Sequence, residues 1–178
     1  KPKNKIKFPV VVKPNFQGST LGLSIINNKN EMDDAVKLSS LFSNEIIIEK
    51  YIKGRELTIG ILGNKVLDAV EIIPKTGFYD YESKYTKGKT NYISPAKIDK
   101  KIESLIKSNA LKIYKALGCR HYARVDFMLD ENNVLYLLEL NSLPGLCSTS
   151  LLPMSAKSAG VNFKELLDII INISLIDK

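Results

Sequence analysis

Residues 122–145, YARVDFMLDENNVLYLLELNSLPG, carry the strongest structural signal in this sequence. Strand-forming residues fill positions 123–129 and again positions 134–141, and the residues between them are DENN. Asp and Asn are favoured in the tight turns of β-hairpins. The sequence therefore predicts two antiparallel strands joined at residues 130–133, with the rest of the fold organised around them.

The turn also predicts which side chains of this hairpin share a face. A four-residue turn pairs Leu129 with Val134, so even positions of the first strand lie opposite odd positions of the second. The polar face then holds Arg124, Asp126, Glu139 and Asn141, and the apolar face holds Val125, Phe127, Leu129, Tyr136, Leu138 and Leu140. One face is expected to be a core and the other a site.

The polar face needs compensation, because ions buried without partners cost several kcal/mol each. A salt bridge from Arg124 to Asp126 or Glu139 is one way to supply it. A Mg²⁺ site is the other, since Asp126, Glu139 and Asn141 offer only hard oxygen ligands. We favour the metal site. The strand then runs into SLPG at 142–145, where a Pro-Gly pair ends regular structure and exposes backbone N–H groups.

The composition is that of an ordinary globular protein, with 178 residues, 44% hydrophobic and 25% charged, enough for one domain or one and a half. The formal charge of +7 comes from 26 basic and 19 acidic side chains, and the lysines are scattered. Nucleic acid or a membrane surface is therefore only weakly indicated, and part of the charge suits an anionic ligand.

Cysteine and histidine usage narrows the chemistry. Cys119 and Cys147 lack the spacing of a metal site and indicate a reduced, cytoplasmic protein. His121 is the only histidine, so a His-based triad or a zinc site is not expected. The apolar run 169–176 is too short to span a bilayer. The chain begins at Lys1 without an initiating Met or a signal-peptide pattern, and we expect it to be part of a longer protein.

The N-terminal part contains a strand that leads into a loop of small residues. Residues 8–14 form a β-branched strand that places Lys13 just before the loop QGSTLG at 17–22. Such a loop lets backbone N–H groups approach an anion, although an ordinary hairpin turn explains it equally well. The elements expected next are a helix capped by Asn30, a strand at 45–52 and antiparallel strands at 55–62 and 65–73.

A long segment at 78–96 has no helical period, which marks a surface loop. Its aromatic residues would suit a solvated linker poorly, so we expect the loop to be functional. Asp99 then caps a helix. After the hairpin, a short helix is expected between Pro153 and Gly160, and Asn162 with Glu165 forms the capping pair of a last helix.

Several motifs follow one another with specific spacing: VVKP at 11–14, IEKYI at 48–52, FYDYESKY at 78–85, RVD at 124–126, LLELNSLPG at 137–145 and STSLLPM at 148–154. Together they resemble the ATP-grasp fold. The motifs at 78–85 and 148–154 resemble more closely the D-alanine-D-alanine ligase family, and the resemblance runs from about Phe8 to the C-terminal helix.

The resemblance implies an α+β fold of the ATP-grasp class, with antiparallel sheets and packed helices in two subdomains. Residues 1–56 would form part of the central subdomain, with the phosphate loop and the hinge strand. Residues 57–178 would form the C-terminal subdomain, with a lid loop, the Mg²⁺ site and the second D-alanine site. The family's N-terminal domain would be absent from this chain.

The activity implied by the resemblance is the ligation of two D-alanines to D-alanyl-D-alanine for peptidoglycan synthesis in the cell wall. It would use ATP and two Mg²⁺ ions, with Mn²⁺ as an alternative, and an acyl-phosphate intermediate. The chain would be the ATP-binding catalytic fragment, inactive by itself. Its partners would be D-alanine and the missing N-terminal domain, with no nucleic acid or membrane, and a homodimer is a candidate assembly of the full-length enzyme.

The resemblance also implies roles for individual residues. For the nucleotide these are Lys13, Ser19, Thr20, Glu49, Lys50, Ile52, Glu56, Phe78, Lys84, Met128 and Asn141. For the metal ions they are Asp126, Glu139 and Asn141, with Glu139 bridging. For the reaction and the second D-alanine they are Arg124, Lys84, Tyr85, Gly145, Ser150 and Leu151. Arg124 and the N–H of Gly145 would stabilise the charge of the tetrahedral intermediate.

One position departs from the family pattern, because Gln17 stands where the family usually has Glu. Two alternatives remain open. The first is another ATP-grasp carboxylate-amine ligase such as a D-alanine-D-lactate ligase, against which the Lys84-Tyr85 pair favours the dipeptide. The second is a basic nucleic-acid-binding module without catalysis, for which the acidic side chains of Asp126 and Glu139 are awkward.

Overall fold

Two antiparallel β-sheets with packed helices form in residues 7–75, 86 and 88–176, which are the residues that the computed structural model describes. The chain divides into two compact units. The first draws on Lys1–Ile52 and Pro74–Thr90, and the second on Lys53–Ile73 and Asn91–Lys178. The subdomain boundary expected from the sequence, between residues 56 and 57, stays a prediction.

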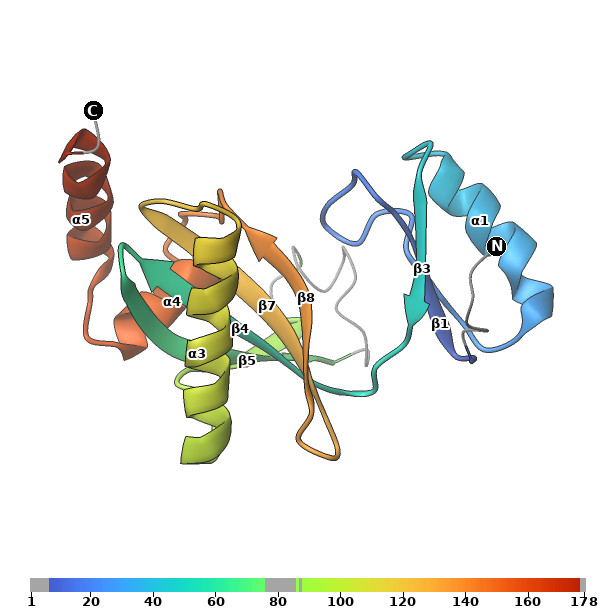
Figure 1. Ribbon diagram of the computed structural model, residues 1–178, viewed down its shortest axis with the longest axis horizontal. Coiled ribbons are helices and arrows are strands. Elements are labelled where there is room, and N and C mark those ends of the chain that lie inside the picture. The colour runs from blue at the N-terminus through green and yellow to red at the C-terminus, as the bar shows by residue number, and fades with distance from the viewer. Residues whose placement is uncertain (1–6, 76–85, 87, 177–178) are drawn as a thin grey trace. The chain divides into compact units, whose positions relative to one another are not determined.

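The first unit is a three-stranded sheet with one helix (Figure 1). Its strands are β1 (Val10–Pro14), β2 (Ser24–Ile26) and β3 (Ile46–Lys50), and β1 lies in the middle. A 3-10 turn, η1 (Lys29–Glu31), leads into the helix α1 (Met32–Ser40). Asn28, whose side chain accepts from the N–H of Asn30, caps this segment, so the prediction that Asn30 is the cap was wrong.

Strand alternation sorts the side chains of β1 onto two faces. Val10 and Val12 pack with Ile26 and with Ala35 of α1 in a small core. Lys13 therefore belongs to the opposite face of the sheet from the α1 core.

The second unit is built on a five-stranded sheet in the order β6-β5-β4-β7-β8. Its strands are β4 (Gly54–Leu62), β5 (Lys65–Pro74), β6 (Thr90–Ile93), β7 (Tyr122–Asp130) and β8 (Leu135–Asn141). The pairs β4–β5, β4–β7 and β7–β8 are all antiparallel. The predicted hairpin is β7–β8, and β4 is the centre of the sheet.

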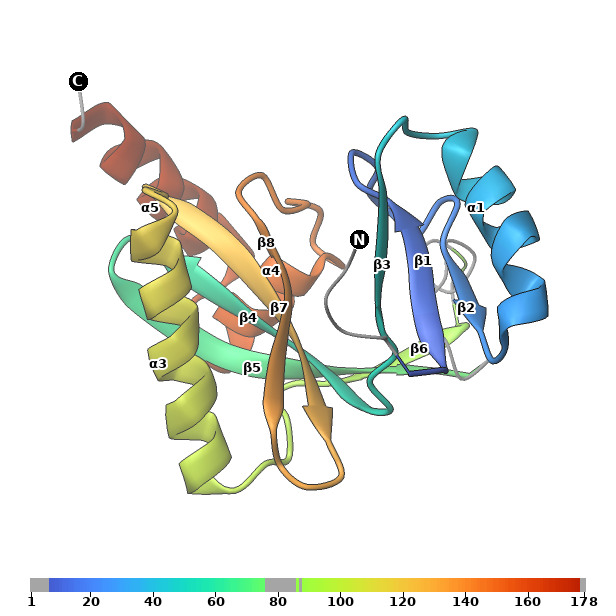
Figure 2. The ribbon, with the colours of Figure 1, turned by 45° about the vertical axis from the view of Figure 1, so that its right-hand side comes forward.

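One face of this sheet packs against the helix α3 (Lys100–Ala116), which lies across it in Figure 2. The contact is apolar on both sides, since Val125 and Phe127 of β7 join Ile106 and Ala110 of α3 in one buried cluster. Asp99 caps α3 as predicted, because its carboxylate accepts from the N–H groups of Lys101 and Ile102.

The other face packs against the short helix α4 (Leu151–Ser158) and, through it, α5 (Phe163–Ile176). Ser155 of α4 fixes this contact: its Oγ accepts from the N–H of Gly60 at 3.0 Å and donates to the carbonyl of Asp68. The predicted capping pair of α5 is confirmed. The side chain of Asn162 accepts a hydrogen bond from the N–H of Glu165, and the side chain of Glu165 accepts one from the N–H of Asn162. Every helix within the described ranges is too short or too polar to cross a lipid bilayer.

The register of the β7–β8 hairpin differs from the prediction near its turn. Leu129 pairs with Leu135 and not with Val134, and an irregularity follows between Asp126 and Phe127. The irregularity shifts the register by one residue, so Asp126 lies opposite Glu139 and Arg124 opposite Asn141. The polar group is therefore assembled as predicted.

The apolar side of the hairpin is only partly as predicted. Val125, Phe127 and Leu129 are buried, but Leu138 is 37% exposed. Tyr136 pairs with Met128 and so shares the face of the even β7 residues, contrary to the prediction. The cause is the extra residue in β8, which sequence parity does not reveal.

We predict that Gly60→Ala lowers the free energy of unfolding by roughly 1–3 kcal/mol, because the added methyl group overpacks the β4–α4 contact. A Cβ at this position would lie 2.6 Å from Leu152 Cδ1 and 2.8 Å from Leu67 Cδ1. Urea unfolding measures the change. Gly18→Ala is the matched control, since a Cβ there meets nothing within 4 Å. Equal stability of the two variants would contradict the prediction.

Candidate functional site

The even-numbered face of β7 presents the Arg124–Asp126 salt bridge, which the sequence analysis gave as the alternative to a metal site. Arg124 Nη2 donates to Asp126 Oδ2 at 2.7 Å and Nε donates to Asp126 Oδ1 at 2.9 Å. Both side chains are largely buried, with exposed fractions of 16% for Arg124 and 9% for Asp126. Glu139 lies at the edge, where its Oε1 is 3.9 Å from Arg124 Nη2 and its side chain is 61% exposed.

A second partner of Asp126 comes from β4 and was missed in the sequence. Thr58 pairs directly with Asp126 across the β4–β7 ladder, and its Oγ1 donates to Asp126 Oδ1 at 2.5 Å. Thr58 is fully buried. No motif marks this residue, because its proximity to Asp126 depends on the pairing of strands that are far apart in the sequence.

Two further predicted residues are brought together on this face. Glu56 of β4 pairs with Met128 of β7, two residues along from the Thr58–Asp126 pair and on the same face. Asn141 ends β8, and its Oδ1 accepts from the N–H of Leu143 at 3.0 Å. The predicted nucleotide and metal residues of the second unit therefore form one continuous row.

The chain after β8 folds into a closed loop that contains the predicted substrate residues. Ser150 accepts at Oγ from the N–H of Cys147 and donates its own N–H to the Cys147 carbonyl at 2.8 Å. A Cβ on Gly145 would lie 2.9 Å from Ser150 Oγ, so the two residues are in close contact within the loop. The structure thus places Gly145 beside Ser150, and Leu151 follows as the first residue of α4.

In the first unit, Lys13 and Glu49 form an ion pair. Lys13 Nζ lies 2.6 Å from Glu49 Oε1, between the neighbouring strands β1 and β3, on the face opposite α1. Lys50 follows Glu49, and strand alternation turns its side chain to the other face. Ile52 lies just beyond β3 and is half-buried.

The loop between β1 and β2 has an unusual backbone. Ser19 and Thr20 have φ values of 57° and 64°, and Gly22 has a φ of 71°. A β-branched residue such as Thr20 rarely adopts this left-handed conformation, and such residues concentrate at ligand clamps. Ser39 of α1 holds the end of the loop by donating to the Gly22 carbonyl at 2.6 Å. This loop is thus a candidate for anion binding.

Three predicted residues, Phe78, Lys84 and Tyr85, lie outside the described residues. Their roles, and that of the surrounding lid loop, stay predictions.

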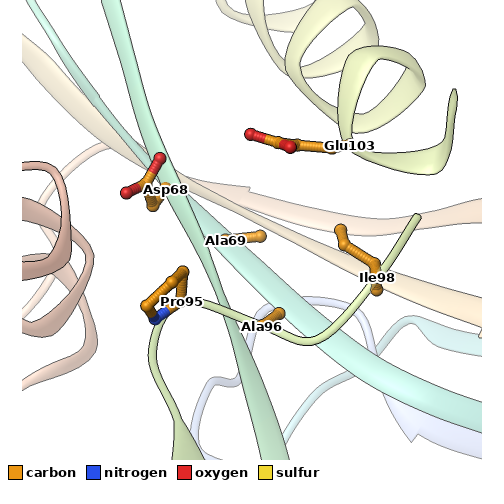
Figure 3. A pocket seen from close by; sticks show the side chains of 6 residues that line it. All are labelled: Asp68, Ala69, Pro95, Ala96, Ile98 and Glu103. Carbon is orange, nitrogen blue, oxygen red and sulfur yellow. The ribbon is translucent and has the colours of Figure 1, made fainter. Parts of the chain in front are cut away.

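The second unit also has a small hollow away from this row, with a volume of about 190 Å³. Asp68 of β5 and Glu103 of α3 line it together with Pro95 and Ile98 (Figure 3). Lys107 donates to both carboxylates, and its bond to Glu103 is the main reason that its pKa lies above the ordinary value for lysine. Lys107 offsets only part of the charge of the two carboxylates, and none of the predicted site residues lines the hollow.

A second ion pair fastens the segment before α3 to the sheet. Arg55 of β4 forms a bidentate pair with Glu71 of β5, with both distances at 2.7 Å, and also donates to the carbonyl of Lys97. Hydrogen bonding to Glu71 raises the pKa of Arg55 above its ordinary value. This pair therefore links β4 to β5 at the residue that precedes Glu56.

The donor set on β7 and β8 fits a hard divalent cation. Over residues 7–75, 86 and 88–176, no three His, Cys, Asp or Glu side chains form a group that could hold a metal ion, so the set rests on two carboxylates and the Asn141 amide. Arg124 Nη2 already places positive charge between Asp126 Oδ2 and Glu139 Oε1. Two carboxylates and an amide oxygen are the hard oxygen ligands that suit Mg²⁺.

The fold and this row of residues define the chain as an ATP-grasp protein. A family model described as D-ala D-ala ligase C-terminus matches residues 1–172, and the chain belongs to this family.

Curated relatives and solved structures agree with this membership. The chain is 44% identical to the D-alanine–D-alanine ligase of Methylacidiphilum infernorum over 172 residues, which cover 96% of the chain and 57% of the relative. It is also 44% identical to that of Buchnera aphidicola over 170 residues, 96% of the chain and 56% of the relative. The chain therefore spans about half the length of these relatives.

Two crystal structures show the same fold. The VanG D-Ala:D-Ser ligase from Enterococcus faecalis matches with a TM-score of 0.84 and 35% identity, over 94% of this chain and 50% of that one. The D-alanine–D-alanine ligase from Bacillus anthracis, solved in complex with ATP, matches with a TM-score of 0.79 and 38% identity, over 95% and 54%.

We predict that Arg124→Met lowers the free energy of unfolding by about 3 kcal/mol or more, because it leaves the buried Asp126 carboxylate without its charged partner. Urea denaturation of Arg124→Met, Asp126→Asn and the double variant measures the coupling. The double variant should be more stable than Arg124→Met alone.

An exposed ion pair provides the control. Lys37 lies 3.6 Å from Asp34, with side chains 77% and 88% exposed, so Lys37→Met should change stability by less than about 0.5 kcal/mol. Additive effects of Arg124→Met and Asp126→Asn in the double variant would refute the pairing.

Proposed function

We propose that this chain is the ATP-binding catalytic part of an ADP-forming D-alanine–D-alanine ligase that serves peptidoglycan synthesis. The observation that carries the proposal is the row of Arg124, Asp126, Glu139 and Asn141 on one face of the β7–β8 hairpin, in a chain of this family. The relative from B. anthracis crystallised with ATP supports ATP as the nucleotide. The free Cys119 and Cys147 support a reducing, cytoplasmic setting.

We propose the following roles for the residues assigned to the nucleotide. Lys13 would bind phosphate oxygens after exchanging its bond to Glu49, which is only part-buried and so can release it. Backbone N–H groups of the loop with Ser19 and Thr20 would close over the same oxygens. Glu49, Lys50 and Ile52 would line the adenine, and Glu56 would bind the ribose beside Met128. Lys84 and Phe78 keep their predicted roles in the phosphate and adenine contacts.

Asp126, Glu139 and Asn141 would hold two Mg²⁺ ions, whose chemistry is to neutralise the phosphate oxygens during transfer. Arg124 would then face the substrate and stabilise the anionic oxygen that develops when the amine attacks the acyl phosphate. The N–H of Gly145 would donate to the same oxygen. Tyr85 would act beside Lys84 at the reacting groups.

The second substrate is bound by the loop that Ser150 closes. Ser150 and Leu151 would contact the second D-alanine, and the buried packing of α4 on Gly60 keeps that loop in place. The similarity to a D-Ala:D-Ser ligase makes D-serine, beside D-lactate, the competing second substrate to assay. Faster turnover with either of these than with D-alanine would replace the D-alanyl-D-alanine assignment but retain the ligase class.

We predict that Glu139→Gln in the full-length enzyme lowers kcat at least about a hundredfold, because a bridging carboxylate is needed to keep the cations near the phosphates. ADP release with D-alanine measures the activity, and urea unfolding should show little change because Glu139 is exposed. Glu131→Gln is the matched control, since it removes the same charge from the turn of the same hairpin. Near-normal turnover with normal Mg²⁺ dependence in Glu139→Gln would refute the metal assignment.

We also predict that these 178 residues alone form no dipeptide. The residues assigned above bind the nucleotide, the metal ions and the second amino acid, and none is assigned to the first D-alanine. An untethered reactant forfeits most of the effective molarity, which reaches about 10⁵ M or more in well-oriented systems. The measurement is D-alanyl-D-alanine formation by this chain and by a ligase of the relatives' full length. Comparable rates would show that the chain is sufficient.

A further inference from the structure

The Asp126 carboxylate accepts hydrogen bonds from two side chains, and these two side chains differ in conformational freedom. Arg124 reaches it from the same strand with a long side chain that is 16% exposed. Thr58 reaches it from the neighbouring strand β4, with its Oγ1 at 2.5 Å from Asp126 Oδ1, while the next acceptor, the Val125 carbonyl, is 3.5 Å away. The single hydroxyl proton of Thr58 is therefore committed to Asp126.

Thr58 cannot move away from this bond. It is 1% exposed on the central strand of the sheet and pairs with Asp126 in the unbroken β4–β7 ladder. A β-branched side chain on a strand is also restricted in χ1. Arg124, by contrast, has four rotatable side-chain bonds and is 16% exposed. Of the two donors, only Arg124 can leave when another cation approaches.

The two donors also bind different oxygens of the carboxylate: Thr58 binds only Oδ1, and Arg124 binds both Oδ1 and Oδ2. Oδ1 receives the Thr58 hydroxyl and Arg124 Nε, whereas the short bond to Oδ2 comes from Arg124 Nη2. Nη2 is also the atom nearest Glu139, at 3.9 Å from Oε1. Departure of Arg124 would open Oδ2 on the side of Glu139, while Oδ1 would still be held by Thr58.

We propose that Thr58 is a positioning residue of the metal site: its hydroxyl fixes the Asp126 carboxylate so that Oδ2 faces Glu139 and stays available to Mg²⁺. This inference rests on the proposed function, which makes Asp126 a metal ligand. A neutral donor suits the role because it orients the carboxylate without cancelling its charge. Hydrogen bonds of this kind, one step behind the ligands, commonly contribute tenfold or more to metal affinity.

The test measures how much Mg²⁺ strengthens nucleotide binding in the full-length enzyme. The dissociation constant of a non-hydrolysable ATP analogue is measured with and without saturating Mg²⁺, and the ratio is the coupling between the two ligands. Thr58→Val should lower this ratio about tenfold and leave the metal-free constant unchanged, because valine keeps the shape and loses only the hydroxyl. Thr58→Ser should stay within about twofold of the parent, because serine restores the donor.

Two further variants separate the possible failures. Asp126→Asn should lower the ratio at least as much as Thr58→Val, and an unchanged ratio there would overturn the proposed metal site itself. A normal ratio in Thr58→Val, with a reduced one in Asp126→Asn, would overturn only the role of Thr58. An equal decrease of the ratio in Thr58→Ser and Thr58→Val would also overturn it, since the effect would then come from altered packing at position 58 and not from loss of the hydroxyl.

A control removes a buried hydroxyl elsewhere. Ser155→Ala deletes the Oγ that bridges Gly60 and Asp68, without touching Asp126, and it should leave the ratio unchanged. Should Thr58→Val fail to fold, Thr58→Ala removes the same hydroxyl with less bulk and is held to the same expected ratio.

Discussion

The pairing of β4 with β7 is the constraint on which the site depends. The ladder runs without a shift from Gly54 opposite Asp130 to Leu62 opposite Tyr122. Because side chains alternate along both strands, this one register sends the odd positions to the α3 core and the even positions to the opposite face. Any slip by one residue would bury Asp126 under α3 and expose Phe127, so the core and the candidate site are specified together.

Most of the fold could be predicted because its signals are local. The β7–β8 hairpin, the Asp99 cap and the Asn162 capping pair each depend on residues close in sequence, and the structure confirms them. The polar group on the hairpin could be predicted for the same reason. The partner of Asp126 could not, since Thr58 is 68 residues away along the chain and no local pattern encodes that register. The extra residue in β8 was missed because nothing in its sequence distinguishes it from a regular strand.

The charged side chains to which we assign a role in ligand binding already have ion-pair partners in the structure. Lys13 is paired with Glu49, and Arg124 with Asp126. Such pairs hold long side chains near the positions where they would act, which lowers the conformational entropy that a ligand must remove. These pairs also oppose ligand binding, since a ligand must interact with each charged side chain more favourably than its present partner does.

The irregular register of β8 has a consequence for the behaviour of the folded chain in concentrated solution. β8 is the last strand of its sheet, and Leu137 and Leu138 are 48% and 37% exposed. A long, regular edge with exposed leucines is a template on which strands of other molecules can add. The displaced residue interrupts the spacing of N–H and C=O groups in β8 and twists the strand locally, so a straight incoming strand cannot match it. The feature that brings Glu139 opposite Asp126 therefore also protects the sheet against edge-to-edge aggregation.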